Sequence, residues 1–144
     1  MHYFADTPNG AWAELLRHEE IREPGDLAGI QRALWAVELP VVPEDSPDLP
    51  GEVLSGGLEV YPQCQQEAAR LHLLGIHGFR VPSAALLPGG AGGWIVDGGL
   101  QPAADRDGEV FVLFGRRPDL VGWPVTLAGS PPEELLERVR HLAR

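Results

Sequence analysis

The stretch Tyr3-Phe-Ala-Asp-Thr-Pro-Asn-Gly-Ala-Trp-Ala-Glu-Leu-Leu-Arg-His18 combines the end of a strand with a complete helix. Thr7 suits the N-cap, because its hydroxyl can accept a hydrogen bond from the first turn, and Pro8 suits the first helical position. Apolar side chains at three- and four-residue intervals predict one buried stripe, formed by Pro8, Ala11, Trp12, Leu15 and Leu16. The sequence therefore predicts a strand ending near Ala5 and an amphipathic helix ending near His18.

Glu14 lies at the border of this stripe. At about 100° per residue it falls just outside one edge, with His18 one turn further along the helix. A carboxylate at such a border is half desolvated and within reach of a ligand. The same position also suits a solvated charge beside a histidine, and the helix pattern alone favours this second interpretation.

Composition sets the class of protein. We expect one domain over the 144 residues, and the apolar content of 44% and charged content of 22% are typical of a soluble globular chain. The net charge of −10 argues against direct binding of a nucleic-acid backbone. The chain has no apolar run long enough for a membrane span and no visible signal peptide, and its lone Cys64 favours a reducing cytoplasm.

Further elements follow from periodicity and from turn residues. The sequence predicts helices at 27–32 (capped by Asp26), 63–74 and 134–141 (opened by a capping box at 130–133), strands at 33–39, 76–81, 94–96 and 109–114, and an extended connection at 40–57. Helices and strands mix without strict alternation, so we expect an α+β fold.

Metal and nucleophile motifs are weak. His72 and His77 stand five residues apart, which is not the spacing of a zinc-binding helix, and no G-x-S-x-G surrounds a serine. Cys64 lies on the apolar face of its helix and is expected to be core. The glycine-rich run at 89–93 matches no nucleotide-binding fingerprint and is interpreted as a turn. We therefore expect no metal.

Ser83 and Arg80 have two interpretations each. Ser83 follows a buried strand and is expected either to cap a short helix at 84–87 or to be displayed at a binding edge. Arg80 alternates with Phe79 and Val81, so its guanidinium lies on the other face of the strand. It can pair with an anionic ligand or with one of the chain's many carboxylates.

Three segments in order resemble the RES domain family, the toxins of Xre–RES toxin–antitoxin pairs. They are residues 3–14 with the strand end and the glutamate-bearing helix, then Gly75-Ile-His-Gly-Phe-Arg-Val-Pro-Ser83, then Val110-Phe-Val-Leu-Phe114. The second segment matches the family's G-x-x-G-x-x-x-P-S pattern and the third its late V-L-F strand. The likeness extends over most of the chain and is least in the proline-rich middle.

The resemblance implies an ADP-ribosyltransferase-like fold, with mixed or antiparallel sheets and flanking helices, that binds NAD and breaks its nicotinamide–ribose bond. The family's glutamate and serine correspond to Glu14 and Ser83, which implies catalytic roles. Its tyrosine corresponds to Tyr3, which implies a place beside the nicotinamide. The family's arginine lies upstream, in a region that precedes the start of this chain, and Arg80 is the candidate to replace it in NAD binding.

Three hypotheses follow. The first is a cytoplasmic NAD-consuming toxin domain, in which the acceptor of ADP-ribose is water, phosphate or a protein. The second is a short, catalytically inactive RES-like domain that binds an Xre-type antitoxin or another copy of itself. The third is an unrelated acidic α+β adaptor.

Overall fold

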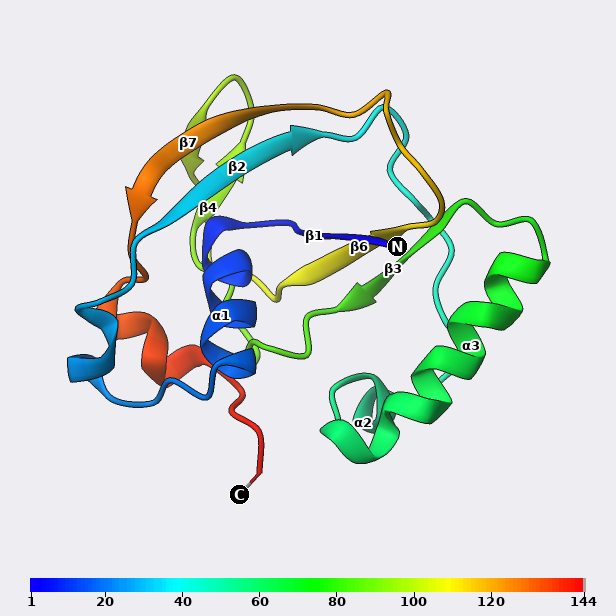
Figure 1. Cartoon of the computed structure of the whole chain (residues 1–144), viewed down its shortest axis with the longest axis horizontal. Coiled ribbons are helices and arrows are strands. Elements are labelled where there is room, and N and C mark those ends of the chain that lie inside the picture. The colour runs from blue at the N-terminus through cyan, green and yellow to red at the C-terminus, as the bar shows by residue number, and fades with distance from the viewer. Residues whose placement is uncertain (144) are drawn as a thin grey trace.

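The computed structural model describes residues 1–143, except for the side chains of residues 95, 96 and 100. Its centre is a three-stranded antiparallel sheet in the order β1-β6-β3, formed by β1 (His2–Ala5), β6 (Glu109–Leu113) and β3 (Gly78–Pro82). In the view of Figure 1, helix α1 lies to the left of this sheet and helix α3 to its right. The fold is α+β, as the mixed pattern predicts.

Helix α1 (Pro8–His18) begins as the sequence predicts. The Thr7 hydroxyl accepts a hydrogen bond from the Gly10 amide (3.1 Å), and Pro8 occupies the first turn. The stripe of α1 packs into a core completed by the C-terminal segment, whose buried members are Trp12, Ala13, Leu16, Leu27, Ala85, Leu86, Ala91, Leu135 and Val139. Helix α1 is thus fixed on its buried side and carries Glu14 at the edge of that side.

Helix α3 (Tyr61–Leu73) forms a second core with the sheet. Its buried members are Ala68, Leu71, Phe79, Val110 and Val112. A left-handed glycine follows the helix at Gly75 (φ 79°), a conformation that other residues rarely adopt. The predicted helix at 63–74 is confirmed, although it begins two residues earlier.

The proline-rich connection at 40–57 is mostly extended, as predicted, but contains the short helix α2 (Gly51–Leu54). Its backbone is tied at two places: the Asp45 carbonyl accepts from the Arg80 amide (2.8 Å), and the Asp48 amide donates to the Glu67 carboxylate (2.9 Å). Arg70 pairs with the same carboxylate, and together these bonds lower the pKa of Glu67 to about 2.

Two antiparallel pairs lie outside the central sheet. The pair of β2 (Arg32–Glu38) and β7 (Val121–Gly129) forms a long ribbon, and β4 (Trp94–Val96) pairs with β5 (Leu100–Pro102). Strands β5 and β7 have no counterpart in the sequence prediction. The reason in β7 is its composition, since Gly122, Pro124 and Gly129 all disfavour a strand.

Three predictions about short helices are wrong. Asp26 lies inside the 3₁₀ helix η1 (Pro24–Leu27), because Pro24 starts it earlier. No helix follows Ser83 at 84–87, where Leu86 instead bridges Val139.

The C-terminal capping box is also absent. The segment forms the 3₁₀ helix η3 (Glu133–Arg138), and Pro132 at its N-cap makes no side-chain capping bond. Pro131 and Pro132 lack N–H groups, and Pro132 holds the backbone extended (ψ 142°), so the helix starts too late for Ser130 to cap it.

The core around α1 generates the first prediction. Leu16 is fully buried, so Leu16→Ala is expected to lower the free energy of unfolding by about 2–5 kcal/mol. Urea denaturation measures the change. Leu73→Ala is the matched control, since Leu73 is 85% exposed on α3 and its loss should change stability by about 0.5 kcal/mol or less. Equal losses in the two variants would contradict the assigned core.

Candidate functional site

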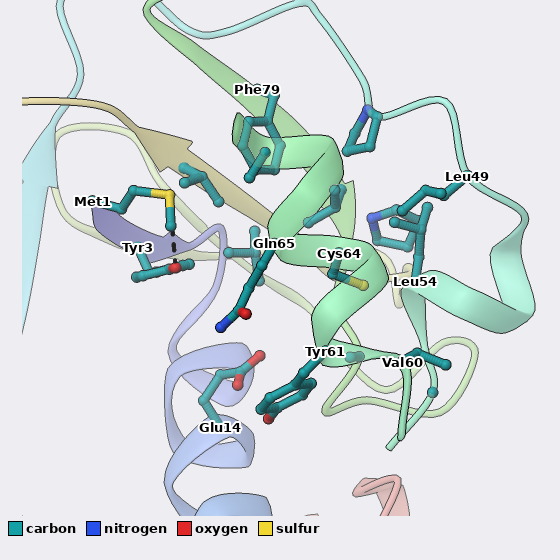
Figure 2. A pocket seen from close by; sticks show the side chains of 18 of the residues that line it. Met1, Tyr3, Glu14, Leu49, Leu54, Val60, Tyr61, Cys64, Gln65 and Phe79 are labelled. Atoms are coloured by element: carbon teal, nitrogen blue, oxygen red, sulfur yellow. Dashed lines mark hydrogen bonds between the residues drawn. The ribbon is translucent and has the colours of Figure 1, made fainter. Parts of the chain in front are cut away.

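A cavity of about 690 Å³ lies between α1 and α3. Its walls come from the two helices and from the segment 47–60 that contains α2, and the central sheet forms its floor. Figure 2 shows Glu14 on the α1 side and Tyr61, Cys64 and Gln65 on the α3 side. Small-molecule sites occupy cavities of about 300–1,000 Å³, so the volume suits a ligand of substantial size.

The register of the sheet explains the apolar floor. Tyr3 pairs with Val112, which also pairs with Phe79, and all three line the cavity. Residues directly opposite one another in antiparallel strands point to the same face. The next row on this face, two residues along each strand, lines the cavity as well and consists of Ala5, Val110 and Val81.

Glu14 supplies a carboxylate to this apolar space. Its side chain is one-third exposed and lies 3.4 Å from Nε2 of His18. Desolvation raises the pKa of Glu14 above its ordinary value, although His18 and Arg17 act in the opposite direction. A carboxylate so placed can accept hydrogen bonds from a bound polyol and can stabilise positive charge that develops near it.

Arg17 was not among the predicted site residues, yet it fixes this wall of the cavity. It is only 4% exposed, and its guanidinium donates to the carbonyls of Ala84 (2.6 Å), Gly56 (2.7 Å) and Arg140 (3.0 Å). The sequence pattern placed Arg17 in the last turn of a helix and gave no signal of these long-range partners. Arg17 holds α1 in place while also lining the cavity.

The α3 wall was also missed. Tyr61 and Gln65 stand one turn apart, and Figure 2 shows both side chains directed toward Glu14. Cys64 between them lines the cavity instead of being fully buried, and burial raises the pKa of its thiol, which keeps the thiol protonated. The i, i+4 spacing of Tyr61 and Gln65 was the available signal, but it did not show which element the helix faces.

Of the predicted site residues, the structure brings Glu14 and Tyr3 together at the cavity. Tyr3 is 63% exposed, and its hydroxyl lies 3.9 Å from the sulfur of Met1. It stands on the floor strand next to α1 (Figure 2). The predicted roles of both residues remain predictions.

Ser83 lies close to the cavity without lining it. Its neighbours Pro82 and Ala84 both line the cavity, whereas Ser83 is 5% exposed and its hydroxyl has no hydrogen-bond partner in the described chain. Its backbone amide donates to the Gly108 carbonyl (2.8 Å). A catalytic role for Ser83 therefore stays a prediction that requires the turn after β3 to rearrange.

Arg80 lies on the opposite face of the sheet. Its guanidinium forms an ion pair with Glu109 and lies 5.4 Å from the centre of the Phe111 ring. This is the carboxylate pairing that the sequence left open as one of two alternatives. Its role in NAD binding stays a prediction.

Within residues 1–143, excluding the three side chains left undescribed, no group of three histidine, cysteine or acidic residues is arranged to hold a metal ion. The described helices also include none that is long and apolar enough to cross a membrane.

The comparison with protein families finds a match. The family model described as the RES domain matches residues 1–135, which is most of the chain and includes every residue assigned to the cavity. Neither the comparison with curated proteins nor that with solved structures finds a match.

The partly desolvated Glu14 carboxylate generates a prediction about stability. Because the pKa of Glu14 is raised in the folded state, the contribution of Glu14 to stability falls as pH rises past the ordinary value of 4.5. Glu14→Gln removes this charge, so we expect its Tm at pH 7 to exceed that of the wild type by about 1–3 °C. Thermal denaturation at pH 7 and near pH 4 measures the difference.

The difference should shrink at the lower pH, where the carboxyl group is increasingly protonated. Glu19→Gln is the control, since Glu19 is exposed just beyond the same helix and should show no such trend. A Tm for Glu14→Gln that lies below the wild type at pH 7 would show that the surroundings stabilise the charge.

Proposed function

The chain belongs to the RES domain family, and on that premise we propose that it is an NAD-consuming toxin domain that cleaves the nicotinamide–ribose bond. The family is associated with NAD-related toxin function in toxin–antitoxin systems. The observation that carries the proposal is the position of Glu14, a partly desolvated carboxylate facing a mainly apolar cavity large enough for the nicotinamide riboside end of NAD.

The chemistry gives this carboxylate a role. When the bond between nicotinamide and ribose breaks, the electron pair leaves with nicotinamide and positive charge develops on the ribose. A fixed carboxylate stabilises this charge more in the transition state than in bound NAD, and that difference accelerates the reaction. An acceptor then attacks the anomeric carbon; when the acceptor is water, the products are ADP-ribose, nicotinamide and a proton.

The other residues take supporting roles in the proposal. The Tyr3 ring stands on the floor beside Glu14 and offers an aromatic surface to the nicotinamide. Arg17 positions α1, and its three carbonyl partners leave it poorly placed to neutralise the diphosphate. Among the described residues that line the cavity, the remaining basic side chain is His18, which is more than half exposed.

The direct test is nicotinamide release from NAD by the purified chain. We expect Glu14→Gln to lower kcat by about 100-fold or more, because it removes a charge that acts mainly in the transition state. Chromatographic quantification of nicotinamide measures the rate. Glu19→Gln repeats the same substitution five residues away at an exposed position and should retain wild-type turnover.

The pH dependence of the same assay adds a second readout. Glu14 must be ionised to act, so the wild-type rate should fall as pH decreases through its raised pKa, at a pH above the usual range for glutamate. The residual activity of Glu14→Gln should lack this acidic limb. Equal turnover by the wild type and by Glu14→Gln would show that Glu14 takes no part in the mechanism.

A second candidate function is binding of an antitoxin without catalysis. The observation that favours it is the β2–β7 ribbon, which exposes five large apolar side chains: Trp35, Val121, Trp123, Val125 and Leu127. Exposed apolar groups gathered on one element are typical of protein contacts.

Calorimetry with NAD separates the two functions. If the chain consumes NAD, we expect a heat of NAD binding in the wild type. We expect the same heat in Glu14→Gln, which binds NAD but turns it over slowly. An absence of NAD binding in both proteins would favour the second function, and tight binding would count against it.

A further inference from the structure

The α3 wall of the cavity carries two polar side chains, Tyr61 and Gln65, that make no side-chain hydrogen bond within the described protein. In the described chain, the side-chain hydrogen bonds of α3 belong to Cys64, Glu67 and Arg70, and none to Tyr61 or Gln65. Both of these residues line the cavity and face Glu14 (Figure 2). Their phenol and amide are therefore free to contact a ligand held between the helices.

We propose that Gln65 selects the carboxamide form of the substrate, so that the chain consumes NAD in preference to its nicotinic-acid analogue. This inference rests on the function proposed above and assigns the specificity of the same site. The Gln65 amide offers one acceptor and two donor hydrogens, and a nicotinamide carboxamide offers the same set in reverse orientation. The two groups can form a pair of hydrogen bonds.

A nicotinic-acid ring cannot form this pair. Its carboxylate has no hydrogen to give to the Gln65 carbonyl, and it brings a negative charge into the cavity that holds Glu14. Gln65 is exposed in the free protein, so discrimination arises when a bound pyridine ring covers its amide: the acid form then leaves the covered carbonyl without a partner. Glu14 and Gln65 thus disfavour the acid form for two separate reasons.

Tyr61 completes this wall one turn before Gln65. Its ring lies beside Glu14 in Figure 2 and offers a flat surface against which a planar ring can pack. The acid and the amide forms share this ring, so Tyr61 supports affinity for both and the discrimination falls to Gln65.

The test compares kcat/KM for NAD and for nicotinic acid adenine dinucleotide. We expect the wild type to prefer NAD by at least about 10-fold. Gln65→Lys removes the paired amide and supplies a cation for the carboxylate, so the preference should shift toward the acid form by about 10-fold or more. Gln66→Lys is the matched control, since Gln66 is exposed on the same helix and does not line the cavity.

Gln66→Lys carries the same new positive charge and therefore any general attraction of a lysine for the dinucleotide. The role of Gln65 is reported by the ratio of kcat/KM between the two substrates, compared between the two variants. Two results would overturn the role of Gln65 and leave the proposed function intact. In the first, the wild type turns over NAD and the nicotinic-acid analogue with equal kcat/KM. In the second, the ratio of the two kcat/KM values is the same in Gln65→Lys as in the wild type.

A wild type that releases no nicotinamide would instead count against the proposed function. In that case NMR titration with nicotinamide and with nicotinate tests the inference on its own. The inference is supported if the protein binds nicotinamide more tightly than nicotinate and if this preference is lost in Gln65→Lys and kept in Gln66→Lys. Any other result overturns the inference.

Discussion

The guanidinium of Arg17 holds the two halves of the site together. Its three carbonyl partners belong to the loop before α3, to the turn after β3 and to the C-terminal segment. A buried charge without partners is costly, so these carbonyls add to the apolar stripe in fixing the position of α1. The cavity exists because α1, anchored in this way, faces α3 across the sheet.

Local signals identified the elements that frame the site. Thr7 and Pro8 predict the start of α1, and the alternation around Phe79 predicts which face of β3 is apolar; both are confirmed. Strand β7 escaped prediction because Pro124 and its glycines disfavour a strand, and its pairing with β2 depends on tertiary structure. Helix η3 was misjudged because two prolines separate Ser130 from its first turn.

The candidate site was predictable at Glu14 on α1 and at Tyr3 on β1, but not on its α3 side. Glu14 was found from its place at the edge of the stripe and from the family resemblance, and the structure puts it in the cavity. Tyr61 and Gln65 could not be found in this way, because which face of α3 meets α1 depends on tertiary packing. Ser83 shows the converse: adjacency in sequence to Pro82 and Ala84 does not carry its side chain into the cavity.

The bond between the Arg80 amide and the Asp45 carbonyl closes one border of the central sheet with the chain's own connection. In the described chain, β1 pairs only with β6, so the opposite border is the one at which another strand can be added. A further strand would consequently join the sheet at the edge formed by β1. A strand that joined there would run alongside Tyr3, and its side chains would extend the floor of the cavity.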